Sequence, residues 1–131
     1  MTIKLRNLVC LQMTYCCAGL LYNVCSMVSL NDTGQPWAPI DPALGVFGMT
    51  VYLFFVSSAF WGRLALYKTL MVVALILIGY NGVIKHVVNY ADLELYRSAA
   101  TWMSAIVVNG VGTALAGIAA VGIFDNPEES I

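Results

Sequence analysis

The sequence predicts an all-α integral membrane protein whose four transmembrane helices form an antiparallel bundle. Four apolar runs fill most of the 131 residues, and short polar connectors separate them. About 20 apolar residues of helix cross a hydrocarbon core of about 30 Å. Hydrophobic residues make up 60% and charged residues 10% of the chain, whereas soluble domains have about 25% charged residues. We therefore expect one membrane domain over 1–131, with helices at about 8–30, 42–61, 69–91 and 98–124 and an acidic tail at 125–131.

The basic residues predict the orientation of this bundle. Four of the six lie before the first run or beside the connector between the second and third runs: Lys4, Arg6, Arg63 and Lys68. Cytoplasmic segments next to transmembrane helices are enriched in Lys and Arg. We therefore expect both termini in the cytoplasm, at a plasma or inner membrane, and the connectors at about 31–41 and 91–97 on the outer side.

The first run is expected to be a retained transmembrane helix. It is about 23 residues long, which is longer than the apolar part of a secretory signal, and no small-x-small cleavage site follows it. Small and polar residues recur along it at spacings of three and four, so they share one helix face. An amide in hydrocarbon needs a partner, and we expect this face to contact other helices. It consists of Gln12, Cys16, Gly19, Asn23 and Ser26.

All four cysteines also lie in the first run, namely Cys10, Cys16, Cys17 and Cys25. Free cysteine is a common small apolar filler of helix interfaces. The alternative for the vicinal pair Cys16-Cys17 is metal or redox chemistry, because thiolates bind soft cations. The chain has no CxxC motif and a single histidine, His86, so we expect packing and no metal site.

The second helix is predicted to begin at Asp41-Pro42, with aspartate as the N-cap and proline at the first helical position. Gly62 should end it, since glycine is favoured just after a helix. Its surface is bulky and suits lipid or a partner subunit. The aromatic residues are Phe47, Tyr52, Phe54, Phe55, Phe60 and Trp61.

The third helix carries a polar cluster near its end. Asn81, Lys85 and Asn89 recur every four residues, and His86 lies beside them. One interpretation is a lysine that snorkels to the interface from a helix end with ordinary interhelical hydrogen bonds. The other is a polar pocket on an ion or substrate path. The candidate pocket residues are Asn23, Asn81, Lys85, His86, Asn89 and Asn109.

The fourth helix has a row of small residues at spacings of four. Such a row lets another helix backbone approach closely, whether it belongs to this chain or to another protein. The candidate helix-packing residues are Ser104, Gly112, Ala116 and Ala120.

The sequence favours no enzymatic function. The seven acidic residues lie in connectors or in the tail, and no nucleophile is spaced with a base and an acid. No cofactor motif is present, and a net charge of −1 argues against nucleic-acid binding. We expect an accessory or structural subunit that contacts lipid and either other membrane subunits or copies of itself. The alternative is a small channel or carrier with a polar path near Asn23, Asn81, Lys85 and His86.

Overall fold

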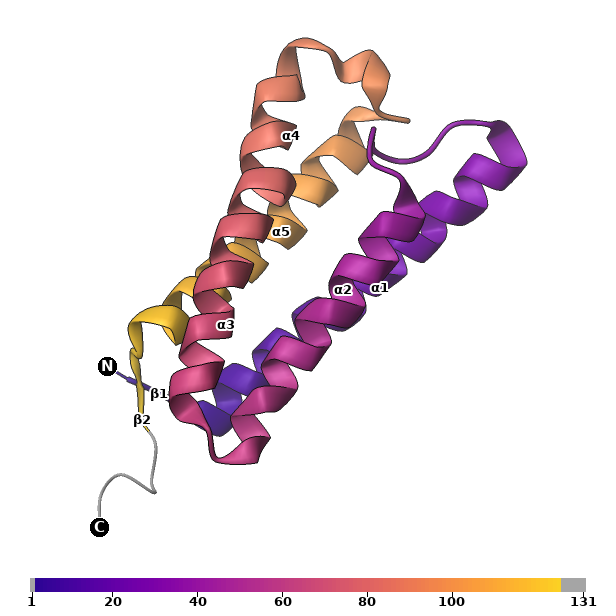
Figure 1. Cartoon of the computed structure of the whole chain (residues 1–131). Helices are drawn as coiled ribbons and strands as arrows, with labels where there is room; N and C mark the ends of the chain where they lie inside the picture. Colours follow the sequence, from indigo (N-terminus) through magenta and orange to yellow (C-terminus); the bar gives the residue numbers. More distant parts are fainter. Residues whose placement is uncertain (1, 126–131) are drawn as a thin grey trace.

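The computed structural model describes residues 2–125, which form helices, the connectors between them and one short strand pair (Figure 1). Within this part, four helical runs are long and apolar enough to cross a membrane. The first is α1 (Leu5–Thr33), and the last is α5 (Ala99–Val121). Between them, α2 (Pro42–Ser57) continues as a 3-10 turn to Trp61. The third run joins α3 (Leu64–Leu77), a π-helical segment (Ile78–Ile84), α4 (Lys85–Val88) and a 3-10 turn (Asn89–Ala91). A further 3-10 turn, Leu93–Leu95, lies in the connector that leads to α5.

The helix boundaries differ from the predicted ones by up to five residues. The third run begins at Leu64 instead of 69, because Leu-Ala-Leu-Tyr-Lys are helix-compatible residues although Lys68 lowers the hydropathy. The connector before it is therefore only Gly62 and Arg63. The last helix is shorter than predicted: α5 ends at Val121 instead of 124, because Gly122 takes a left-handed conformation with φ 74°.

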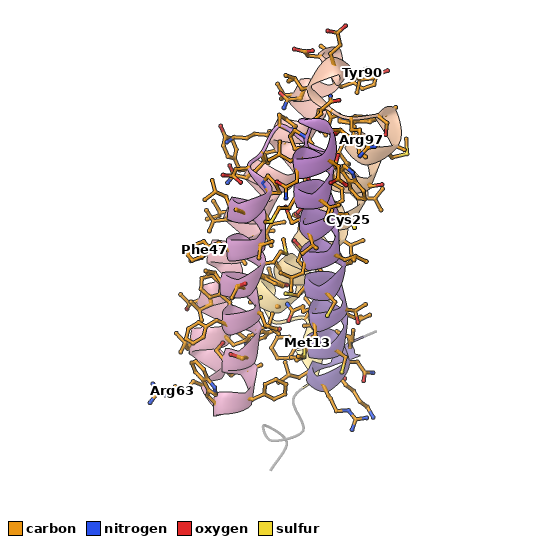
Figure 2. The ribbon with its side chains drawn as sticks, turned by 90° about the vertical axis from the view of Figure 1, so that its right-hand side faces the viewer. Met13, Cys25, Phe47, Arg63, Tyr90 and Arg97 are labelled. Atoms are coloured by element: carbon orange, nitrogen blue, oxygen red, sulfur yellow. The ribbon has the colours of Figure 1, made fainter. Side chains whose placement is uncertain are left out.

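The four runs alternate in direction and form two closely packed pairs (Figure 1). α1 packs along α2, α3 packs along α5, and α1 also contacts α5. The contact between α2 and α3 is small by comparison, and the two helices diverge toward the connectors at 34–41 and 92–98. We call this the connector end, and the opposite end, which carries Gly62 and both strands, the strand end. Figure 2 shows Arg97 and Tyr90 at the connector end and Arg63 at the strand end.

The ends of α2 follow the predicted local signals. The Asp41 carboxylate accepts a hydrogen bond from the Ala43 backbone N–H at 2.9 Å, and Pro42 occupies the first helical position. At the other end, Gly62 has φ 65°, a conformation that L residues with a Cβ adopt at a cost. Asp41 therefore fixes where this helical run begins, and Gly62 fixes where it ends and the chain reverses direction.

Two short strands join the chain ends at the strand end. β1 (Ile3–Lys4) pairs in parallel with β2 (Phe124–Asp125), and the Thr2 hydroxyl donates to the Asp125 carboxylate. Lys68 Nζ lies 5.4 Å from the centre of the Phe124 ring. This pair departs from the all-α prediction, and it places Asp125, the first residue of the predicted tail, in a strand. The remainder of that tail, 126–131, lies outside the described residues.

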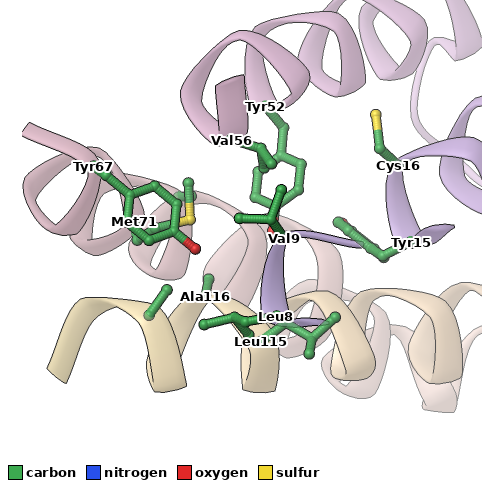
Figure 3. Close-up of a cluster of buried hydrophobic side chains, with 12 residues drawn as sticks. Leu8, Val9, Tyr15, Cys16, Tyr52, Val56, Tyr67, Met71, Leu115 and Ala116 are labelled. Atoms are coloured by element: carbon green, nitrogen blue, oxygen red, sulfur yellow. The ribbon is translucent and has the colours of Figure 1, made fainter. Parts of the chain in front are cut away.

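The apolar core fills the half of the bundle nearer to the strand end, and Figure 3 shows its side chains close together between the helices. α1 contributes the predicted face, since Gln12, Cys16 and Ser26 are each at most 2% exposed. Gln12, Cys16, Gly19 and Asn23 contact other helices as predicted, whereas Ser26 accepts a hydrogen bond from the connector at 34–41. The core residues are Leu8, Val9, Tyr15, Cys16, Tyr52, Val56, Tyr67, Met71, Ala74, Leu115, Ala116 and Ala119.

Candidate functional site

A cavity of about 540 Å³ lies in the other half of the bundle, where α2 and the third run diverge. Its lips are exposed apolar side chains, with Leu44 and Phe47 on α2 and Leu77 on α3. Its floor is formed by α1 through Tyr22, Asn23 and Ser26 and by α5 through Asn109. The cavity therefore opens sideways, between two helices, rather than along the bundle axis.

Each asparagine of the floor packs against a glycine on the facing helix. The Asn23 side chain fills the space in front of Gly45 on α2. The Asn109 side chain does the same at Gly82, where an added Cβ would lie 2.5 Å from Asn109 Cγ. The amides also donate to their own helices, Asn23 to the Gly19 carbonyl and Asn109 to the Ala105 carbonyl, both at 2.8 Å. The two amides therefore pack against neighbouring helices as well as line the cavity.

The polar residues of the third run point in different directions. Asn81 donates to the Leu77 carbonyl at 3.1 Å and lines the cavity. Lys85 is exposed at the rim, and its Nζ lies 5.3 Å from the centre of the Tyr80 ring. The π-helical segment between α3 and α4 changes the helical phase just before Lys85. Asn89 begins the 3-10 turn after α4 and does not line the cavity, and its amide donates to the Tyr96 hydroxyl instead.

His86 is buried, and a tyrosine of the 92–98 connector binds it. His86 Nδ1 lies 2.7 Å from the Tyr96 hydroxyl, and Asn89 Nδ2 donates to that hydroxyl at 3.5 Å. Burial raises the pKa of Tyr96, so the hydroxyl keeps its proton and can donate it to Nδ1. This arrangement suits a neutral imidazole with its proton on Nε2. The Trp102 indole N–H also donates to the His86 carbonyl, at 2.8 Å.

The connector at 34–41 folds over the end of the cavity and is held by hydrogen bonds. Ser29 donates to the Gln35 carbonyl at 2.7 Å and accepts from Arg97 Nη1 at 2.6 Å. The Trp37 N–H donates to Ser26 Oγ at 2.9 Å. Ala38 and Ile40 of the same connector line the cavity. This segment closes the cavity toward the connector end.

A buried polar contact closes the bundle on the other side of the cavity. The Tyr67 hydroxyl donates to Gln12 Oε1 at 2.7 Å, and Gln12 Nε2 donates to Met71 Sδ at 3.2 Å. Gln12 and Met71 are both fully buried. Three of the four long helical runs meet here, because Gln12 Nε2 also donates to the Leu115 carbonyl of α5 at 3.4 Å.

Five of the six residues predicted to form a polar pocket line this one cavity: Asn23, Asn81, Lys85, His86 and Asn109. Helical spacing could group the residues of the third run but could not show which other helices face them. Sequence reasoning missed Tyr96, Ser29 and Arg97. Their pairing depends on two connectors meeting at one end of the bundle, and no local spacing signals it.

The vicinal cysteines point to different sides of α1. Cys16 is buried, and its thiol donates to the Met49 carbonyl on α2 at 3.2 Å. Cys17 is exposed, as expected for neighbours that are about 100° apart around a helix. Within residues 2–125, no three His, Cys, Asp or Glu side chains lie close enough to hold a metal ion.

The small row of α5 is divided between two environments. Gly112 and Ala116 are buried against the rest of the chain, and an added Cβ at Gly112 would overlap the Tyr15 ring. Ala120 is half-buried, whereas Ser104 is exposed and donates to the Ala100 carbonyl at 2.8 Å. Gly112 and Ala116 therefore pack within this chain, and Ser104 does not.

No protein-family model, curated protein or solved structure matches this chain.

Proposed function

We propose that this chain is a non-enzymatic integral membrane protein that serves as an accessory or structural subunit of a larger or homo-oligomeric membrane complex. The observation that carries the proposal is how the polar groups are used. Asn23, Asn81, Asn109 and His86 bond within the chain, and the Gln12–Tyr67 contact closes the bundle beside the cavity. The asparagines are satisfied by carbonyls of their own helices, His86 holds the 92–98 connector, and Gln12 and Tyr67 join two helices. Polar side chains that already have partners within the chain suit a scaffold better than a conducting path.

The exposed surface also favours a membrane location with protein partners. α2 presents Phe47 at 67% and Phe54 at 58% exposure, and Phe60 in the following turn is 68% exposed. Aromatic surface of this extent suits hydrocarbon or a neighbouring transmembrane helix. The basic residues near the strand end, among them Arg6, Arg63 and Lys68, favour a cytoplasmic position for that end and for both termini.

Mild-detergent extraction of the tagged chain from its native membrane tests this proposal. We expect sodium carbonate to leave the protein in the membrane pellet, and purification to recover either a fixed set of larger subunits or a defined homo-oligomer. A monomer without partners would refute the subunit role. Release by carbonate would refute the membrane location.

A small carrier is the second candidate, because Asn23, Asn81, Lys85 and His86 all line one cavity. Such a carrier would have to open the Gln12–Tyr67 contact during transport or line a path between copies. Solute flux through liposomes that contain only this chain would favour it.

A further inference from the structure

We infer that the lateral cavity binds one membrane lipid that has an anionic headgroup. The inference rests on the proposed membrane location but not on the subunit role. The cavity is about 540 Å³, within the range of about 300–1,000 Å³ that is usual for small-molecule sites. It opens between two of the helices that are proposed to span the bilayer, so its mouth faces hydrocarbon. A ligand reaches such a mouth from within the membrane.

The lining is apolar where an acyl chain would lie. The middle of the cavity is walled by aliphatic and aromatic side chains and by the bare backbone of Gly48. An added Cβ at Gly48 meets nothing within 4 Å, so the space beside this glycine is open. The apolar walls are formed by Leu44, Phe47, Val51, Phe55, Leu77 and Ile78.

The polar part of the lining lies where a headgroup would be. Lys85, His86 and Asn81 come from the last part of the third run, near the connector end. A span of this length puts its end near the bilayer interface, where headgroups lie.

The charge of the lining selects the headgroup. Lys85 is the one cationic residue among the described residues that line the cavity, and none of these residues is acidic. His86 is already bonded to Tyr96, and Asn81 to its own helix. Among the described residues, Lys85 Nζ has the Tyr80 ring as its one partner, so its three N–H groups can donate to a phosphate. An anionic phospholipid satisfies both the apolar walls and this lysine.

Native mass spectrometry of the purified protein tests the inference, with dioleoyl phosphatidylglycerol and dioleoyl phosphatidylcholine as competing probes. We expect the wild type to hold one phosphatidylglycerol per chain in preference to phosphatidylcholine. Lys85→Met should reduce this preference about fivefold, which corresponds to about 1 kcal/mol per lysine. Lys85→Arg should retain it. Inorganic phosphate should not displace the lipid, because it cannot occupy the apolar walls.

A second pair of variants tests the location of the lipid. Gly48→Phe fills the open space in the cavity and should lower the occupancy of both lipids at least fivefold. Gly110→Phe is the matched control, since Gly110 on α5 also has nothing within 4 Å of its Cβ position but does not line the cavity. It should bind lipid like the wild type.

Three results would overturn the inference. One is equal binding of the two lipids by the wild type, and another is unchanged lipid occupancy in a folded Gly48→Phe. The third is a change of oligomeric state in Gly48→Phe without loss of lipid, which would assign the cavity to a second copy of the chain. If Gly48→Phe does not fold, the comparison of Lys85→Met with Lys85→Arg decides, because Lys85 is exposed.

Discussion

Replacement of Gly112 by leucine tests the packing of α5 against α1. A Cβ at this position would lie 2.5 Å from Tyr15 Cε2 and 2.7 Å from Tyr15 Cε1, so the ring has to move. Tyr15 is 4% exposed and packs edge-on against Tyr52, with 5.2 Å between ring centres. Overpacking costs about 1–3 kcal/mol, and loss of the aromatic pair costs about 0.5–1.5 kcal/mol. Gly110→Leu adds the same side chain with nothing within 4 Å.

We expect Gly112→Leu to be less stable than Gly110→Leu by about 2–4 kcal/mol. The comparison cancels the gain in helix propensity that both variants share. Unfolding in detergent micelles, followed by tryptophan fluorescence, measures the difference. In a Tyr15→Ala background the cost of Gly112→Leu should largely disappear, because the clashing ring is absent. Equal stability of the two leucine variants would refute the close contact between these helices.

Three further predictions concern other parts of the bundle. Tyr67→Phe should lower the free energy of unfolding by about 1–3 kcal/mol, because it leaves buried Gln12 Oε1 without a donor. The control is Thr69→Val, which removes an exposed hydroxyl. Equal denaturation curves for the two variants would contradict the prediction. Lys85→Met and His86→Phe should leave assembly and the activity of the parent complex nearly unchanged. The activity of the wild-type complex should show no pH dependence near 6.5 that His86→Phe could remove. A sharp fall in activity with intact assembly would favour the carrier. A cysteine that replaces Thr33 should react with an impermeant thiol reagent added outside intact cells. A cysteine that replaces Ser130, which lies beyond the described residues, should not react. The opposite labelling pattern would show that the predicted orientation is wrong.

Hydropathy was sufficient to predict the four helical runs, because each is a continuous apolar stretch. Their ends were less predictable. Lys68 lies within α3 although its charge resembles that of a connector, since a helix can extend beyond its apolar part. Asp41 and Gly62 were predictable as helix ends because capping depends on one or two residues.

The candidate cavity was predictable only in part. Residues that share one helix face, such as Asn81 and Lys85, follow from spacing. Asn89 donates instead to Tyr96 of the 92–98 connector, and this contact has no signal in a single sequence. Tertiary contacts such as Asn23 against Gly45 and Asn109 against Gly82 require the helix order around the bundle, which periodicity does not contain.

Solute flux through liposomes that contain only the purified chain tests the proposed function most directly. The Gln12–Tyr67 contact closes the bundle beside the cavity, so we predict that ion and proton leakage equals that of protein-free liposomes. Reconstitution is verified by protease protection, so that the absence of flux reports on inserted protein. A saturable flux that Lys85→Met abolishes would contradict the subunit role and establish the chain as a carrier.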